Sequence, residues 1–240
     1  MRFASLATLA LAASQTASAL VGSYWTFSGN PPGGLRNVTF PFKMDGASHS
    51  SGYHFAQKFN FEGLRKVGYC GIQNRPSHAN RSIVHALFST SQGDATSQDK
   101  NCFPGANGGP GISCTVDFYG SYDIVYNIVV ENVQNTTWVG RAVNNSTGKS
   151  LHIGSWTLPP TSGGISPTQV GLVEYYPWRA DRHKCHSLPK TAVTMYDPFS
   201  VTPGAGTGSI LGPHEYGDCV GRVAYSAEKI GNGYRIQCGF

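Results

Sequence analysis

The chain has 240 residues, a formal net charge of +5 and only 13% charged residues. This mild positive excess is well below that of domains that bind nucleic acids, so we expect no nucleic-acid partner. No run of apolar residues approaches the roughly 20 that a membrane-spanning helix needs, so we expect no membrane partner. The 30 glycines and the 12% aromatic residues are typical of extracellular all-β domains, whose many turns need glycine.

The first 19 residues have the pattern of a secretory signal peptide. Arg2 supplies a positive charge, residues 3–13 form a short apolar core, and ASA at 17–19 is a small-residue cleavage site. The pattern predicts a secreted, extracellular protein whose mature chain begins near Leu20. Residues 20–240 are then long enough for one domain with one well-filled core.

Short runs of β-forming residues, separated by turn residues about every 8–12 positions, follow one another along residues 20–240. Alternation is clearest in YHFAQKFNF (53–61), where Tyr53, Phe55 and Phe59 share one face and His54 and Lys58 share the other. Helix signals are nearly absent, apart from a possible turn at 226–230. The pattern predicts a single antiparallel β-sandwich of the jelly-roll or concanavalin-like type. The strands are expected at 24–27, 38–42, 53–61, 66–73, 82–89, 113–119, 122–130, 137–143, 150–157, 169–176, 191–196, 220–225 and 234–238.

Six cysteines form an even set without the C-x-x-C spacing of zinc or redox sites. In an oxidising compartment, three structural disulfides are expected. Cys102–Cys114 is the first choice, because the Gly- and Pro-rich loop between these residues needs a cross-link. Cys185–Cys219 and Cys70–Cys238 then follow by elimination.

The sequence contains N-x-S/T sequons, which accept glycans in a eukaryotic secretory pathway. We therefore expect a glycoprotein with its sequons on exposed turns, and no binding face around residues 135–147. The sequons lie at Asn37, Asn80, Asn135, Asn144 and Asn145.

Residues 91–112, SQGDATSQDKNCFPGANGGPGI, form the longest irregular stretch. Loops of this length in compact domains are usually functional or disordered. Two interpretations stay open. The stretch is either a rigid loop that closes one end of the sandwich or a part of a ligand cleft.

Residues 171–186, GLVEYYPWRADRHKCH, combine a predicted strand with aromatic and basic side chains. Aromatic faces stack on sugar rings, and guanidinium groups pair with carboxylates. The segment therefore predicts a partner that is an anionic polysaccharide. Charges at His183, Lys184 and His186 are interpreted as surface charge. The predicted substrate-binding residues are Tyr176, Trp178, Arg179 and Arg182.

Several sequence blocks between residues 53 and 178 follow one another in a recognisable order: YHFAQKFNF, GYCGIQNRP, IVHALFSTSQGD, GGPGISCTVDF, TTWVG, HIGSWTLP and GLVEYYPW. In this order the chain resembles a family of small secreted microbial proteins of uncharacterised function. The resemblance implies a concanavalin-like or jelly-roll β-sandwich that attaches to, or processes, polysaccharide. In fold, size and site chemistry the chain also looks like the fungal glucuronan lyases, which is an analogy of architecture.

A lyase on a uronic-acid polymer needs a group that neutralises the C6 carboxylate, a base for the C5 proton and an acid for the leaving oxygen. His54 lies on the polar face of its predicted strand, and Gln73 ends another strand. Only one of Tyr175 and Tyr176 can face a groove, and Tyr175 is preferred because Pro177 bends the chain just after Tyr176. The predicted catalytic residues are His54, Gln73 and Tyr175.

Other chemistries have less support in the sequence. A glycosidase needs paired carboxylates, and no pairing is visible among the few strand-adjacent acids, of which Glu174 and Asp117 are the first to test. His85 is flanked by apolar residues and is interpreted as a core histidine. A calcium site could use acids that fall in loops, but no EF-hand or repeat spacing supports one. No cofactor and no metal are therefore expected. The loop acids are Asp94, Asp99, Glu215 and Asp218.

Three functions stay open on the sequence. The first is a secreted carbohydrate-active protein, most concretely a polysaccharide lyase on an acidic glycan. The second is a non-catalytic, lectin-like carbohydrate-binding module. The third is a secreted effector or elicitor that acts through a host protein. A monomer is expected.

Overall fold

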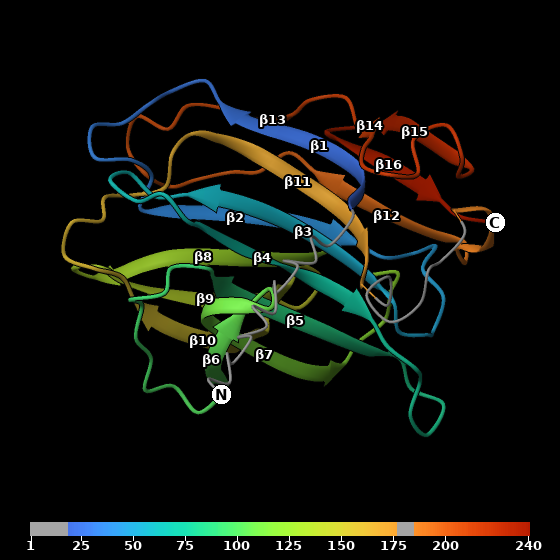
Figure 1. The fold of residues 1–240 in the computed structure, drawn as a ribbon, viewed down its shortest axis with the longest axis horizontal. Helices are drawn as coiled ribbons and strands as arrows, with labels where there is room; N and C mark the ends of the chain where they lie inside the picture. The colour runs from blue at the N-terminus through green and yellow to red at the C-terminus, as the bar shows by residue number, and fades with distance from the viewer. Residues whose placement is uncertain (1–18, 177–184) are drawn as a thin grey trace, which may run out of the picture.

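The computed structural model describes residues 19–176 and 185–240, which form two antiparallel β-sheets packed face to face (Figure 1). The predicted all-β sandwich is confirmed. The described residues contain no α-helix, and η2 (Cys185–Ser187) is a 3-10 turn. None of their helices is long and apolar enough to cross a membrane.

One sheet has nine strands in the order β13-β1-β11-β3-β4-β5-β7-β6, with β14 also paired to β1. The other has seven strands in the order β10-β9-β8-β2-β12-β16-β15. The strands are β1 (Ala19–Phe27), β2 (Asn37–Lys43), β3 (Tyr53–Asn60), β4 (Val67–Asn74), β5 (Ile83–Thr90), β6 (Cys102–Ala106), β7 (Gly109–Tyr119), β8 (Tyr126–Gln134), β9 (Thr137–Asn144), β10 (Ser150–Thr157), β11 (Thr168–Tyr175), β12 (Thr191–Tyr196), β13 (Gly208–Ile210), β14 (His214–Glu215), β15 (Tyr225–Ile230) and β16 (Gly233–Cys238).

Alternation along β3 decides which residues form the core and which are left for a site. Phe55 and Phe59 are completely buried between the sheets. Because successive side chains of a strand point to opposite faces, His54 and Lys58 lie on the outer face of the nine-stranded sheet. Burial of each large apolar side chain stabilises the sandwich by about 1.5–3 kcal/mol, which fixes the face that β3 presents outward.

The structure differs from the expected strands where pairing overrides local sequence. Residues 121–124 form a turn, closed by the Ile124 N–H bond to the Ser121 carbonyl, so β8 begins at Tyr126 instead of 122. Residues 226–230 are a strand because they pair with β16, and 102–106 are a strand because they pair with β7. Of the expected strand 220–225, only Tyr225 lies in a strand. Strand preference depends on such partners, which lie far away in the sequence.

Two of the predicted disulfides, Cys102–Cys114 and Cys185–Cys219, are confirmed. The third, Cys70–Cys238, is wrong: both residues are buried free thiols, Cys70 in β4 and Cys238 at the end of β16 in the other sheet. Burial raises the pKa of Cys70 well above its usual value and that of Cys238 to about 12. Oxidation needs the thiolate, which burial suppresses. Pairing by elimination fails because it assumes that every cysteine is paired.

Candidate functional site

A row of polar residues crosses five adjacent strands on the outer face of the nine-stranded sheet. Glu174 on β11 is paired with His54 on β3, which is paired with Gln73 on β4. The row continues from Gln73 to His85 on β5 and Asp117 on β7. Residues directly opposite each other in an antiparallel sheet share a face. The fold therefore brings together His54 and Gln73, two of the three residues predicted as catalytic.

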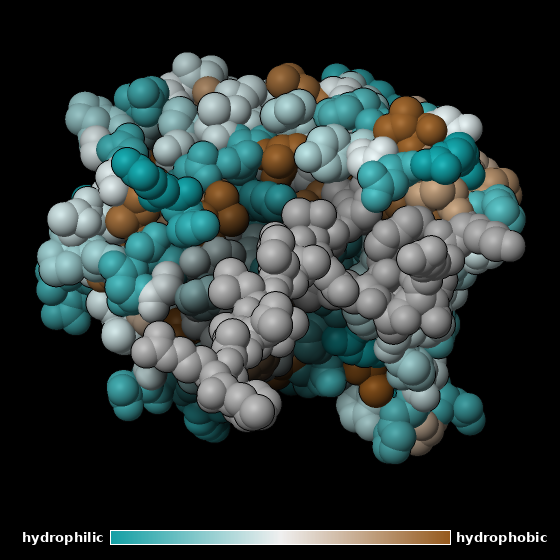
Figure 2. Space-filling model, viewed as in Figure 1, coloured by the Kyte–Doolittle hydropathy of each residue, from teal (hydrophilic) through white to brown (hydrophobic). Residues whose placement is uncertain are grey.

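A groove of about 490 Å³ lies over this face and is lined by Glu174, His54 and Gln73. Its floor comes from β11, β3, β4 and β5, and its walls come from opposite edges of the sheet. One wall is the tip of the β6–β7 hairpin, and the other is Tyr216, just after β14. Where Figure 2 shows described residues, the surface is mostly hydrophilic with scattered apolar residues. Of the residues that line the groove, Glu174, His54 and Gln73 offer polar groups to a ligand.

His54, which lines the groove, has a buried ring nitrogen that forms no hydrogen bond with described residues. The residue is 8% exposed, and its Nε2 has no hydrogen-bond partner among the residues that the structure describes. Burial, followed by the charges of His85, Arg75 and Lys58, lowers the pKa of His54 to about 3. The imidazole is therefore neutral at ordinary pH and can donate one hydrogen bond. An unpaired buried polar atom costs about 1–3 kcal/mol, which a ligand atom at Nε2 would offset.

Tyr176 lines the groove directly after β11. Its backbone N–H donates to the Gly52 carbonyl at 2.9 Å. Its hydroxyl accepts a hydrogen bond from Nη1 of Arg75 at 3.0 Å, and the guanidinium lies 6.0 Å from the ring centroid. Arg75 therefore orients the phenol and places a positive charge beside its oxygen.

The preference for Tyr175 over Tyr176 is wrong in its geometry. The Tyr175 ring packs against the core, with its centroid 5.0 Å from that of Tyr53. It also covers Gly52, where a Cβ atom would lie 2.4 Å from the ring. Alternation then sends Glu174 and Tyr176 to the opposite side, into the groove. Pro177, on which the preference rested, lies outside the described residues.

His85 and Asp117 end the row, and the sequence interpretation missed them as a pair. Nδ1 of His85 lies 2.6 Å from Oδ1 of Asp117. Burial and the charge of Arg75 lower the pKa of His85, and the hydrogen bond and charge of Asp117 oppose this shift. His85 belongs to the face that holds the groove, so its interpretation as a core histidine is wrong. The available signal was the alternation of IVHALFS, but apolar residues on both of its faces obscured it.

Glu174 and Asp117 are too far apart to act as paired carboxylates. They are separated by four strand spacings of about 4.8 Å each, which places their backbones about 19 Å apart. Glycosidases that use two carboxylates hold them about 5–9.5 Å apart. Glu174 and Asp117, the two acids to test first for a glycosidase, therefore do not form such a pair, as expected from a sequence in which no pairing of acids is visible.

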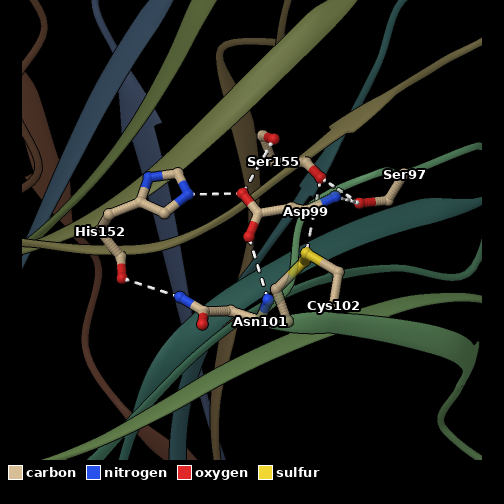
Figure 3. Close-up of a disulfide and its surroundings, with 7 residues drawn as sticks. Ser97, Asp99, Asn101, Cys102, His152 and Ser155 are labelled. Carbon is tan, nitrogen blue, oxygen red and sulfur yellow. Dashed lines mark hydrogen bonds and ion pairs between the residues drawn. A yellow bond between two sulfur atoms is a disulfide. The ribbon is translucent and has the colours of Figure 1, made fainter.

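The sequence leaves residues 91–112 open as either a rigid loop that closes one end of the sandwich or a part of a ligand cleft, and each interpretation fits one part of the stretch. Its first part is clamped to β10: Thr96 and Thr157 exchange backbone hydrogen bonds, and Asp99 lies 2.5 Å from Nε2 of His152 (Figure 3). Its second part is the β6–β7 hairpin, with the Cys102–Cys114 disulfide at the base and Asn107 at the tip. Only the tip reaches the groove.

The described acids do not form a metal centre. Within residues 19–176 and 185–240, no group of three or more His, Cys, Asp or Glu side chains is arranged to hold a metal ion. Asp99, one of the loop acids considered for calcium, instead accepts hydrogen bonds from the Asn101 backbone and the Ser155 hydroxyl and contacts His152. This carboxylate is part of the loop clamp.

Three of the predicted substrate-binding residues, Trp178, Arg179 and Arg182, lie outside the described residues, as do His183 and Lys184. Their roles stay predictions. The fourth, Tyr176, lies in the groove.

No protein-family model and no curated protein matches the sequence. Among solved structures, a scytalido-glutamic peptidase with a transition-state analogue has a TM-score of 0.49 at 11% identity, over 94% of this chain and 100% of that one. SCP-B, an eqolisin peptidase in complex with a tripeptide, has a TM-score of 0.41 at 11% identity over the same shares. The CBM2 module of a Lactobacillus casei phage J-1 protein has a TM-score of 0.31 at 12% identity, over 64% of this chain and 68% of that one.

Proposed function

We propose that the protein binds an acidic polysaccharide outside the cell and cleaves it by β-elimination at a uronate. The observation that carries this proposal is the position of His54, Gln73 and Tyr176 in one groove. His54 supplies a neutral imidazole, Gln73 supplies an amide, and Tyr176 supplies a phenol that the Arg75 guanidinium orients. The resemblance of the sequence blocks to secreted proteins with an implied role on polysaccharide agrees with it.

In this proposal, Gln73 and His54 bind the carboxylate of the substrate. The amide N–H of Gln73 and the N–H of the neutral His54 ring donate hydrogen bonds to it, and Nε2 of this ring has no hydrogen-bond partner among described residues. These bonds offset the charge of the carboxylate, so that the C5 proton becomes removable. With its pKa lowered to about 3, His54 is a weak base and is better suited to donate.

Tyr176 carries the proton. Tyr176 first gives its hydroxyl proton to solvent, and Arg75 offsets the negative charge of the resulting phenolate, whose oxygen then takes the C5 proton. The electron pair of the C5–H bond forms the C4–C5 double bond, and the C4–O4 bond breaks. The leaving oxygen then takes the proton from the Tyr176 hydroxyl. No water is consumed, and one product carries an unsaturated uronate.

Incubation with polyglucuronate, alginate and pectin tests the proposal, with the ultraviolet absorbance of the unsaturated product as the readout. We expect absorbance to rise with at least one of these polymers and not with a neutral glucan. Binding without product would indicate the non-catalytic carbohydrate-binding alternative, which Tyr69, Tyr176 and Tyr216 in the lining also favour. Absence of binding to all three would overturn the proposal and favour the secreted effector.

The variant Glu174→Gln distinguishes cleavage by elimination from cleavage by hydrolysis. A hydrolase in this groove would use Glu174, the acid of the described lining, to activate water, so Glu174→Gln would abolish cleavage. Elimination does not need this carboxylate. In our proposal, Glu174→Gln still forms the unsaturated product and has a lower KM, because a negative charge that opposes an anionic substrate is removed.

A further inference from the structure

Lys58 lies on the floor of the groove at some distance from the residues of the proposed reaction. It follows His54 by four residues on the same face of β3 and is paired with Tyr69 on β4. At about 3.4 Å per residue, its backbone lies about 14 Å from that of His54 along the groove. The groove therefore has a second polar end, built from other side chains.

The ammonium group of Lys58 is not neutralised by the protein that the structure describes. The ion pairs formed by described residues involve Lys43, Arg141, Arg235, His85 and His152, and none involves Lys58. The side chain is only partly exposed and lies beside Tyr69 and Ser89 in the lining. A partly desolvated cation in such a place gains from an anion that a ligand brings.

The floor between the two polar ends is apolar. Ala56 on β3 lies between His54 and Lys58, and it is flanked by Leu172 on β11 and Gly71 on β4. Leu87 on β5 continues this strip. A ligand that fits both ends thus carries two anionic groups, separated by a part that can lie on an apolar surface.

A polysaccharide fits this floor better than an acidic peptide does. Extended peptides commonly bind by adding a strand at a sheet edge, where backbone groups are unpaired. Here β11, β3, β4 and β5 are each paired on both sides, so the floor offers side chains and no free backbone ladder. The faces of Tyr69 and Tyr216 supply surfaces on which sugar rings can stack.

We propose that Lys58 forms a second anion-binding subsite, which holds another carboxylate of the same acidic polysaccharide chain while His54 and Gln73 hold the first. The subsite rests on the proposed function and defines its substrate class as a polymer with repeated carboxylates. A single uronic acid, which occupies only the His54 end, does not use it.

Calorimetric titration with polyglucuronate oligosaccharides and with free glucuronic acid tests the subsite. We expect Lys58→Met to weaken binding of the oligosaccharide about tenfold and to leave that of the monosaccharide unchanged. Lys149→Met, which removes an exposed lysine from the turn before β10, is the matched control and should bind as wild type does. Oligosaccharide binding should also depend less steeply on salt in Lys58→Met than in wild type.

The possible failures are distinguishable. If wild type binds the oligosaccharide and Lys58→Met binds it equally well, the subsite is wrong and the proposed function stands. If wild type binds no acidic glycan, both are wrong. Equal binding of polyglutamate would overturn the assignment to polysaccharide. A Lys58→Met protein that does not fold is replaced by Lys58→Gln, and unchanged binding by that variant overturns the subsite.

Discussion

His54 on β3 and Gln73 on β4 are directly opposite each other in the antiparallel register, and both line the groove. The Cβ atoms of such a pair lie about 4.5–5.5 Å apart, so one carboxylate can contact both side chains. The pair is held by the sheet itself, because β3 and β4 are internal strands on a filled core.

Replacement of Gln73 by Glu should abolish activity on an acidic polymer without unfolding the protein. The change keeps the shape of the side chain, but it replaces an N–H donor with a second negative charge. Loss of one such donor typically lowers kcat by about 10²–10³. Gln134→Glu, at the exposed end of β8, is a matched control that should keep wild-type rates. Full activity of Gln73→Glu would remove Gln73 from the mechanism.

The two adjacent tyrosines should differ sharply when each loses its hydroxyl. Tyr176→Phe removes the proposed proton carrier and should lower kcat at least about 100-fold, with little change in KM. Tyr175→Phe keeps the ring that packs on Tyr53 and Gly52, so it should remain active. Rates and thermal melting of the two variants, measured side by side, decide between them. The reverse result would restore Tyr175 as the residue of the groove.

His54 should make the fold sensitive to mild acid. Its pKa is about 6.5 when unfolded and is lowered to about 3 in the folded protein. Between pH of about 6.5 and about 3, the unfolded chain therefore takes up a proton at His54 and the folded protein does not. The free energy of unfolding is highest above pH of about 6.5 and decreases as the pH falls through this range. The loss attributable to His54 approaches about 1.4 kcal/mol per pH unit. Urea unfolding of wild type and His54→Leu at several pH values should show a smaller acid loss in the variant. Parallel curves would contradict the buried, neutral state.

The Asp99 clamp should contribute to stability in a pH-dependent way. Burial alone would raise the pKa of Asp99, but hydrogen bonds from His152, the Asn101 backbone and Ser155 outweigh it and lower the pKa (Figure 3). This contribution is present above the unfolded pKa of about 4 and is lost as the pH falls through the lower folded value. Because His152 is half exposed and solvent screens the pair, Asp99→Asn should cost only about 1–2 kcal/mol at pH of about 7. Asp94→Asn, at an exposed position, is the control in thermal melting.

The two buried cysteines should be countable as thiols. Without reductant, alkylation of the unfolded protein should modify Cys70 and Cys238, and the folded protein should resist modification because both side chains are buried. Intact mass after alkylation measures both states. A mass that shows no thiol in the unfolded protein would restore the third disulfide.

The alternation of polar and apolar residues predicts the sandwich and the outward position of His54. It fails in β11, where both faces of the strand carry apolar residues. In β3, apolar and polar residues alternate, so the outward position of His54 follows from YHFAQKFNF. In β11, Leu172 and Val173 are adjacent, apolar and both buried, so alternation does not tell which parity faces the groove. The choice between Tyr175 and Tyr176 therefore depended on packing against Tyr53, which lies far away in the sequence.

Two side-chain contacts at the site join residues that are distant in the sequence. Asp117 meets His85 only because β5 and β7 pair, although 32 residues separate them. Arg75 reaches the Tyr176 hydroxyl across a separation of 101 residues. No local pattern encodes such meetings, whereas the Cys102–Cys114 cross-link, only 12 residues apart, could be predicted from its loop.

The row from Glu174 to Asp117 takes a single residue from each of five strands, and this makes the site dependent on strand alignment during folding. A slip of one residue in any of these strands would turn its polar residue into the apolar interior and its apolar neighbour outward. Such a slip at β4 would bury Gln73 and expose Ile72. Any misaligned sheet thus loses the site and gains an exposed apolar side chain, so the groove and correct strand alignment should be acquired in the same step.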